Sequence, residues 1–339
     1  MNSDKHITER HDWRHEEIKA IFEQPLVDLM LKAQLVHRQC HDPHEIQPCR
    51  IQSIKTGACP EDCKYCPQSG HHQVKIEKER LYSLDKTLAI AKDAKTKGAT
   101  RFCMGVAWRE IPHNAQFDQV LEMVRQIDEL GLEVCLTAGM LTSEQANKLK
   151  QAGCTAYNHN LDTSPEYYDK IISTRTYQER LDTINHVRQS GISVCCGGII
   201  GLGESRTDRI SLLAQLAALK PHPESVPINL LAKFDNMPLN HVEPPHPYEM
   251  VRMIASARLI MPKSIIRLSA GRTAMSDELH ALCYFAGANS VFMASEKMFI
   301  TPNPKLDRDQ EILGLLGMRF SQRRFTKDRL THVDHSLSH

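Results

Sequence analysis

The chain has 339 residues, with 42 Lys and Arg against 41 Asp and Glu, so its formal net charge at pH 7 is +1. Such a balanced charge excludes the strong field by which proteins recruit nucleic acid or an anionic membrane surface. No apolar run reaches the roughly 18 residues of a membrane-spanning helix, so none is predicted. The length suits one large domain, such as an α/β barrel of about 250 residues, or two ordinary ones.

The start of the chain and its cysteines predict a protein of a reducing compartment. The opening residues are charged and lack the apolar segment of a secretory signal. Acidic residues such as Asp4, Glu9 and Glu16 are untypical of a transit peptide, so we expect a cytoplasmic location. The 11 cysteines are an odd number and scattered. Thiols in such a compartment indicate metal binding or catalysis rather than disulfides.

The two ends of the chain differ from its middle. Residues 1–40 are predicted to form a helical extension that carries no readable chemistry. Residues 317–339 are polar and rich in Arg, His and Ser, which predicts a disordered tail.

Between these ends, short apolar segments alternate with helical patterns. The eight strand candidates are residues 50–54, 100–104, 133–137, 154–158, 193–196, 226–230, 264–268 and 290–293. Helical patterns over 84–97, 117–130 and 143–152 each stop at a glycine, as is typical of the residue after a helix. Eight strand-then-helix units predict the α/β class and a (β/α)8 TIM-type barrel over residues 41–316. Periodicity does not show closure, so a doubly wound open sheet remains an alternative.

Three cysteines in one short loop follow the first strand. Three residues separate Cys59 from Cys63 and two separate Cys63 from Cys66, so one loop can present three thiolates to one centre. A structural zinc site uses four N or S ligands, usually as two separated pairs. A cubane iron–sulfur cluster binds thiolates, and three of them would leave its fourth iron open for a substrate. A zinc loop completed by a distant His or Cys remains the alternative.

A second group of polar and sulfur-containing residues falls within or at the end of different strands. Its members are Cys103, Cys135, Asn158, Cys195, Asn229 and Arg267. These residues would converge if the strands close into a barrel, because the active site of such a barrel lies at the C-terminal ends of its strands.

Taken singly, a buried cysteine usually behaves as a small hydrophobic residue. That interpretation is preferred for Cys40, Cys49, Cys154, Cys196 and Cys283. Neighbours on a strand point to opposite faces, so only one of Cys195 and Cys196 can face the barrel interior, and Cys195 is favoured.

The cysteine loop, with Tyr65 before its last cysteine, resembles that of the radical S-adenosylmethionine (SAM) superfamily. Further segments resemble the biotin synthase family within it, over roughly residues 20–316. The segments that carry the resemblance are residues 59–69, 102–109, 131–135, 157–163, 173–177, 194–204, 226–229 and 266–272. The chain departs from the family pattern at Ala294 and at residues 298–300, where we expect altered packing rather than lost activity.

The resemblance implies a barrel that holds two clusters, with SAM and dethiobiotin between them. It implies a [4Fe–4S] cluster on Cys59, Cys63 and Cys66. It implies a deeper [2Fe–2S] cluster on Cys103, Cys135, Cys195 and Arg267. It implies SAM contacts at Tyr65, Asp162, Gly197, Gly198, Gly201 and Glu204. Dethiobiotin would be held at its ureido ring by Asn160 and Asn229, because amides offer both donors and acceptors.

Two of these implied roles have a competing physical interpretation. A guanidinium stays protonated in nearly every protein setting, so only the resemblance supports Arg267 as a ligand. An ion pair would instead need a distant partner such as Asp162 or Glu204. Glycine-rich turns such as residues 197–203 also serve plain strand-to-helix packing.

The activity implied is that of a sulfurtransferase that converts dethiobiotin to biotin. A 5′-deoxyadenosyl radical from SAM would remove hydrogens, and the [2Fe–2S] cluster would supply the sulfur. The resemblance also implies a low-potential electron donor of flavodoxin or ferredoxin type, the iron–sulfur assembly machinery and a homodimer. Two alternatives remain: a related radical SAM enzyme, as in hydrogenase maturation or pyrrolysine assembly, and a non-enzymatic iron–sulfur carrier or sensor.

Overall fold

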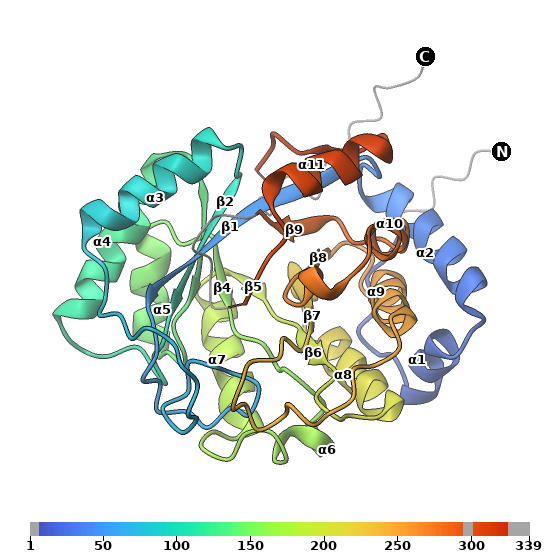
Figure 1. The fold of residues 1–339 in the computed structure, drawn as a ribbon, viewed down its shortest axis with the longest axis horizontal. Coiled ribbons are helices and arrows are strands. Elements are labelled where there is room, and N and C mark those ends of the chain that lie inside the picture. Colours follow the sequence, from blue (N-terminus) through green and yellow to red (C-terminus); the bar gives the residue numbers. More distant parts are fainter. Residues whose placement is uncertain (1–6, 294–300, 325–339) are drawn as a thin grey trace.

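Eight parallel strands close into a barrel in the computed structural model, which describes residues 7–293 and 301–324 (Figure 1). The strands are β1 (Glu45–Lys55), β2 (Arg101–Val106), β3 (Glu133–Thr137), β4 (Ala156–Asn158), β5 (Ser193–Cys195), β7 (Ser225–Leu230), β8 (Ile265–Leu268) and β9 (Ser290–Phe292). Each pairs with the next, and β9 returns to β1 with Gln47 opposite Ser290. All eight predicted strands are present, and this closure confirms the barrel and rules out an open sheet.

Helices surround the barrel and follow its strands. They are α3 (Leu84–Thr96), α4 (Ala115–Glu129), α5 (Ser143–Gln151), α6 (Pro165–Tyr168), α7 (Tyr177–Gln189), α8 (Arg206–Ala218), α9 (Tyr248–Ile260), α10 (Asp277–Phe285) and α11 (Leu306–Leu315). Several begin at a residue whose side chain accepts a hydrogen bond from the first turn, as Thr142 does from Gln145. The predicted glycines Gly98, Gly131 and Gly153 end α3, α4 and α5 with φ near +90°, a conformation that favours glycine.

The fifth strand has a break that sequence periodicity did not predict. A short segment, β6 (Gly198–Ile200), resumes after β5 and also pairs with β7. Gly197 lies at the break, where a Cβ atom would come within 1.9 Å of the carbonyl oxygen of Pro227. Any side chain there would collide with the β7 backbone, so this glycine is required for packing.

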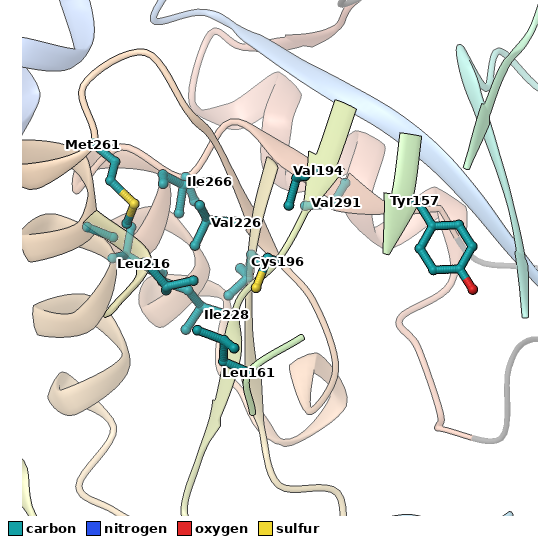
Figure 2. Packing of buried hydrophobic residues seen from close by; sticks show 14 of the residues in the cluster. Tyr157, Leu161, Val194, Cys196, Leu216, Val226, Ile228, Met261, Ile266 and Val291 are labelled. Carbon is teal, nitrogen blue, oxygen red and sulfur yellow. The ribbon is translucent and has the colours of Figure 1, made fainter. Parts of the chain in front are cut away.

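The main hydrophobic core lies between the barrel and its helices. Figure 2 shows Cys196 in this layer among apolar side chains that include Leu161 and Ile228. Cys195 belongs instead to a separate cluster of buried residues inside the barrel. The expectation that Cys195 rather than Cys196 faces the interior is therefore confirmed, as strand alternation requires.

Two helices precede the barrel, α1 (His15–Phe22) and α2 (Leu26–Cys40), and they pack on its outside against α8 and α9 (Figure 1). Within the described residues, every helix is too short or too polar to span a bilayer. The departures at Ala294 and residues 298–300 lie outside the described residues.

The predicted disordered tail is wrong for its first residues. A short strand, β10 (Arg319–Phe320), pairs with β1 opposite Glu45 and Ile46. Ser321 is fully buried, and its hydroxyl donates to the Glu45 carboxylate over 3.0 Å. This polar segment is ordered because its backbone pairs with the first residues of β1. Amino-acid composition gives no information about such a pairing. The rest of the predicted tail, residues 325–339, lies outside the described residues.

Candidate active site

A cavity of about 290 Å³ joins the cysteine loop to the barrel interior. Most of the residues singled out from the sequence line it: Cys59, Cys63, Tyr65, Cys66, Cys103, Cys135, Asn158, Asn160, Asp162, Cys195, Asn229 and Arg267. Loop and strand residues more than 200 positions apart in the chain therefore meet in one site. Below, the "outer thiols" are Cys59, Cys63 and Cys66, and the "inner thiols" are Cys49, Cys103, Cys135 and Cys195.

The loop that carries the outer thiols folds back on itself. The Cys59 amide donates to the carbonyl of Gln68 over 3.0 Å, and the Gly70 amide donates to the carbonyl of Cys59 over 2.7 Å. The Cys66 amide donates to the carbonyl of Cys63 over 2.9 Å. These backbone bonds close the loop, and all three thiols line the cavity.

Two carboxylates between the outer thiols attach this loop to the barrel. Glu61, which is buried, forms an ion pair of 2.9 Å with Arg109 after β2. Asp62 accepts hydrogen bonds from the amides of Ser173 (2.9 Å) and Thr174 (3.2 Å). Sequence reasoning gave neither carboxylate a role, although both lie inside the motif and residues 173–177 were among the matching segments.

Burial controls the protonation of the outer thiols. It raises the pKa of Cys63 to about 11, although the charges of Arg180 and Arg175 oppose the shift. Burial likewise raises the pKa of Cys59 and of Cys66. Without iron these thiols therefore keep their protons at neutral pH, and binding iron as thiolates must release them.

The half-buried Tyr65 and the buried Asp162 and Arg180 form a polar group on the cavity wall. The Tyr65 hydroxyl donates to Asp162 Oδ2, and Arg180 Nη2 pairs with the same oxygen over 2.6 Å. Burial and the Asp162 charge raise the pKa of Tyr65 well above its usual value, so it stays a hydrogen-bond donor. Both contacts use Oδ2 of Asp162. Arg180 was missed in the sequence, because a helical arginine gives no signal of such a partner.

The inner thiols and Arg267 lie together inside the barrel. Cys103 and Cys135 are directly opposite each other on β2 and β3, and Cys195 comes from β5. Arg267, which is 1% exposed, donates from Nη2 to Cys49 Sγ over 3.3 Å and from Nη1 to Cys195 Sγ over 3.6 Å. Its Nε donates to Ser290 Oγ over 3.0 Å. The closed barrel thus surrounds one guanidinium with sulfur and hydroxyl groups.

Arg267 keeps its proton in this surrounding. Burial lowers the pKa of Arg267, but the neighbouring Cys49 and Cys195 outweigh burial and raise that pKa above its usual value. The two carboxylates considered as partners are engaged elsewhere, Asp162 with Arg180 and Glu204 with Arg209 (2.7 Å). In the part of the chain that the structure describes, no carboxylate forms an ion pair with Arg267.

Cys49 corrects the interpretation made from the sequence, which was that of an ordinary hydrophobic residue. It is fully buried and clusters with the other three inner thiols. Burial raises the pKa of Cys49, but a hydrogen bond from Cys103 and the charge of Arg267 outweigh burial and lower the pKa to about 6. The predicted first strand began at residue 50, whereas β1 begins at Glu45. Cys49 was therefore not counted as a strand residue, and the alternation of inward and outward side chains along the strand was not applied to it.

Two asparagines on the cavity wall are oriented by the backbone. Asn160 Oδ1 accepts from the Gly197 amide (3.1 Å) and from Asn158 Nδ2 (3.0 Å). Asn229 Oδ1 accepts from the Ala270 amide (3.1 Å), and its Nδ2 donates to the Gly198 carbonyl (3.0 Å). Fixed amides of this kind can recognise a neutral ring that has both donors and acceptors.

An unpaired polar atom in the same cavity fits a polar ligand. His159 Nε2 is buried, lines the cavity and has no hydrogen-bond partner among the described residues, whereas Arg175 Nε lies 4.0 Å from the Glu61 carboxylate as an ion pair. Buried polar groups are usually paired, so such an atom indicates a partner that the chain itself does not supply.

Four further residues that were expected to contact SAM do not line this cavity: Gly197, Gly198, Gly201 and Glu204. A Cβ on Gly198 would meet the Leu212 side chain at 2.4 Å, and one on Gly201 would meet Pro245 at 3.0 Å, so packing explains both glycines as it does Gly197. Glu204 accepts from the amides of Gly201 and Leu202 and thereby holds the turn. The structure assigns these residues to shaping the wall behind the site.

The arrangement of thiols also bears on the zinc alternative. Across residues 7–293 and 301–324, no three His, Cys, Asp or Glu side chains are arranged to hold one metal ion. Zinc requires all its donors at about 2.0–2.3 Å from one point. In an iron–sulfur cluster the cysteines bind several irons, so their sulfur atoms need not converge on one point. The described side chains therefore form no preassembled site for a single zinc ion.

Two family models match this chain. A radical SAM superfamily model matches residues 53–216, and a biotin and thiamin synthesis associated domain model matches residues 227–319. The first covers β1 to α8 with the outer thiols, and the second covers the half of the barrel that carries Asn229 and Arg267.

Curated relatives match over nearly their whole length. The biotin synthase of Photobacterium profundum is 51% identical over 321 residues, which are 95% of this chain and 91% of that protein. The biotin synthase of Hahella chejuensis is 54% identical over 314 residues, 93% and 88% of the two chains. The solved FeFe-hydrogenase maturase HydG from Carboxydothermus hydrogenoformans aligns with a TM-score of 0.78 over 92% of this chain and 78% of that one. Its identity is 18%, so that likeness shows the fold alone.

Proposed function

The chain belongs to the biotin synthase family of radical SAM enzymes, and we propose that its outer and inner thiols hold two different iron–sulfur clusters that serve sulfur insertion into dethiobiotin. The observation that carries the proposal is one shared cavity, which is lined by the three outer thiols, by Cys103, Cys135 and Cys195 of the inner thiols, and by two fixed asparagines. A reaction that uses SAM and then a sulfur source needs both within reach of one substrate.

At the mouth, Cys59, Cys63 and Cys66 would hold a [4Fe–4S] cluster with one iron open for SAM. When bound there, this cluster supplies the electron that cleaves SAM to methionine and a 5′-deoxyadenosyl radical, chemistry that no side chain can perform. The ion pair of Glu61 with Arg109 and the hydrogen bonds of Asp62 hold the loop in a ligand-ready shape. Asp162 Oδ1, which the contacts of Tyr65 and Arg180 do not use, would suit a ribose hydroxyl, and these two contacts fix the carboxylate.

At the base, Cys103, Cys135 and Cys195 would hold a [2Fe–2S] cluster that supplies the sulfur, with Arg267 beside them. Asn160 and Asn229 would bind the ureido ring of dethiobiotin and keep its reacting carbons between the two clusters. The barrel wall keeps water and other hydrogen donors from the reactive carbon, which is the main task left to the protein.

The test is anaerobic reconstitution with iron and sulfide, followed by incubation with SAM, dethiobiotin and a low-potential reductant. We expect biotin and 5′-deoxyadenosine to form together. An iron–sulfur carrier or sensor would form neither product. A related radical SAM enzyme with another substrate would release 5′-deoxyadenosine without biotin, and that result would refute the proposed substrate.

Supply of electrons and sulfur would come from other proteins. We propose a low-potential donor of flavodoxin or ferredoxin type, because cleavage of SAM needs an external electron. If the inner cluster gives up its sulfur, the iron–sulfur assembly machinery must rebuild it after turnover. Purified flavodoxin and ferredoxin, each tested for support of 5′-deoxyadenosine release, would identify the donor class.

We also propose a homodimer. On α2, Val27, Leu31 and Leu35 are 74%, 55% and 54% exposed and lie four residues apart, so they form one apolar stripe on the helix. Light scattering of the parent and of Leu31→Glu tests this, since a charge in the stripe should shift a dimer that uses α2 toward monomer. An unchanged dimer would place the interface elsewhere.

A further inference from the structure

A short strap, residues 69–72, lies against the loop that carries the outer thiols. It follows the last of these thiols and turns back onto residues 59–63, where its four residues donate to four backbone carbonyls. The Gly70 amide donates to Cys59 (2.7 Å), the Ser69 hydroxyl to Glu61 (2.6 Å), and the imidazoles of His71 and His72 contact Pro60 and Cys63 (2.9 Å each). Side chains of the strap therefore add to the backbone bonds that close the loop.

The peptide group after Cys63 is held by three hydrogen bonds. Its carbonyl accepts from the Cys66 amide and from Nε2 of His72, both over 2.9 Å. Its N–H, which belongs to Lys64, donates to the carbonyl of Ile171 over 3.1 Å. A carbonyl oxygen only accepts, so Nε2 of His72 is the protonated nitrogen of the ring. Of the three bonds, only that of His72 comes from a side chain, and a substitution can therefore remove it alone.

His72 acts on the site from outside the cavity. Its side chain is half-buried and is not among the residues that line the cavity, whereas Cys63 lines it. Any effect of His72 on a ligand must therefore pass through the backbone of Cys63. A fixed backbone leaves the thiol fewer orientations to lose when it binds iron, and groups that orient a metal ligand in this way strengthen metal binding.

We propose that His72 is a positioning residue of the outer cluster, which holds the backbone of Cys63 in the conformation that presents its thiolate to iron. The proposal rests on the function proposed above and deepens it at the outer site. His71 should contribute less, because its bond to the Pro60 carbonyl is exposed and water can replace the donor there.

Three replacements of His72 separate its hydrogen bond from the bulk of its ring. In His72→Gln the amide nitrogen lies as many bonds from Cβ as Nε2 does, so it can still donate to the Cys63 carbonyl. In His72→Asn the nitrogen stops one bond short, and His72→Ala has no donor. His186→Ala is the matched control, because His186 is also half-buried and contacts a carbonyl, that of Leu141, over 2.9 Å, but lies near the far end of α7.

The first measurement uses the apo protein and needs no cluster. Hydrogen–deuterium exchange of peptides that cover residues 59–70 should be about three- to tenfold faster in His72→Ala and His72→Asn, since one hydrogen bond of the loop is lost. His72→Gln and His186→Ala should exchange like the parent. Melting temperatures should agree among all variants, because the strap is a local contact, and they show that each variant is folded.

The second measurement is iron retention by the outer cluster. Each variant is made in a Cys135→Ala background, where only the outer site loads, and is reconstituted with iron and sulfide under anaerobic conditions. Release of iron to a chelator should be about tenfold faster in His72→Ala and His72→Asn than in the background protein, the range found when support of a metal ligand is lost. His72→Gln should restore slow release, and His186→Ala should not change it.

The outcomes that would overturn the inference differ from failure of the proposed function. Slow release by His72→Ala would mean that the strap orders the loop without serving the cluster, even if exchange is faster. Release by His72→Gln as fast as by His72→Ala would mean that the ring rather than its hydrogen bond matters. If the background protein binds no iron at all, the outer cluster itself is refuted, and the proposed function falls with it.

Discussion

The outer and inner thiols perform related tasks but are built in different ways. The outer thiols lie within eight residues of one loop, two of them partly exposed, and the loop's own backbone bonds bring them together. The inner thiols lie on four strands, all are buried, and the pairing and register of these strands make them neighbours. A local motif can therefore be read in the sequence as a unit, whereas the inner site can be read only once strand register is known.

The two groups also differ in electrostatics. Burial raises the pKa of every outer thiol, and the nearest guanidiniums act only at a distance. Among the inner thiols, hydrogen bonds from Cys103 and Cys195 lower the pKa of Cys135 well below its usual value, and the pKa of Cys49 is lowered as well. The same hydrogen bonds, together with burial, raise the pKa of Cys103 and of Cys195. Burial alone therefore does not decide thiol chemistry, because a buried cation and shared hydrogen bonds reverse its effect.

The largest expected effect is the loss of any outer thiol. Cys59→Ala, Cys63→Ala and Cys66→Ala should each reduce 5′-deoxyadenosine release by about a thousandfold or more, since an underligated cluster cannot deliver the electron and no side chain replaces it. Cys154→Ala, which removes a thiol from the main core, is the control and should retain release. Full release by any one of the three variants would refute the assignment of the loop.

Loss of one inner thiol should separate the two tasks. Cys135→Ala should keep SAM cleavage and the outer cluster but abolish biotin formation, because Cys135 lies at the centre of the inner group and outside the loop. Biotin and 5′-deoxyadenosine are measured in the same reaction. Biotin formation at the parent rate with a normal inner-cluster spectrum would make Cys135 a packing residue.

Charge at position 267 should matter more than the shape of the side chain. Arg267→Lys should keep the fold, both clusters and part of the activity, since a cation remains among the thiols. Arg267→Glu should cost about 3–5 kcal/mol of folding free energy, because it buries an unpaired carboxylate beside an anionic cluster. Denaturant unfolding and inner iron content test the pair, and complete loss of the inner cluster in the Lys variant would contradict the expectation.

Cluster loading at the outer site should depend on pH. The pKa of Cys63 is raised to about 11, so its thiolate fraction grows about tenfold per pH unit between pH 7 and 9. Iron uptake by the apo protein should therefore accelerate with pH in a Cys135→Ala background, where only the outer site loads. The reverse sign, faster uptake at lower pH, would exclude thiol deprotonation as the limiting event.

The smallest effect is expected at the loop anchor. Asp62→Ala removes the acceptor for the amides of Ser173 and Thr174, at a cost of about 1–3 kcal/mol for the freed groups. We expect weaker SAM binding by several fold and a nearly unchanged melting temperature of the barrel. Equilibrium binding of SAM to the reconstituted protein measures this, with the exposed Asp85→Ala as control. Equal affinities would show that the loop needs no anchor.

Sequence reasoning located the elements of this fold better than their contacts. All eight strands were predicted, because each strand-helix unit has its own local signal, an apolar segment followed by a helical pattern. The missed features are the β6 resumption after Gly197 and the pairing of Arg319 with β1. Both features depend on pairing with a strand that is distant in the sequence, β7 for β6 and β1 for Arg319. The hydrophobic periodicity of a local segment does not identify such a partner.

The sequence by itself determined the three-thiol loop and the choice of Cys195 over Cys196, because loop spacing and strand alternation are properties of neighbouring residues. Only the tertiary structure decided that Cys49 joins the inner thiols and that Arg267 has sulfur rather than carboxylate partners. Cys49 and Arg267 are brought into contact by strand register and barrel closure. That closure depends on the packing of the whole barrel, so no short segment of the sequence contains it.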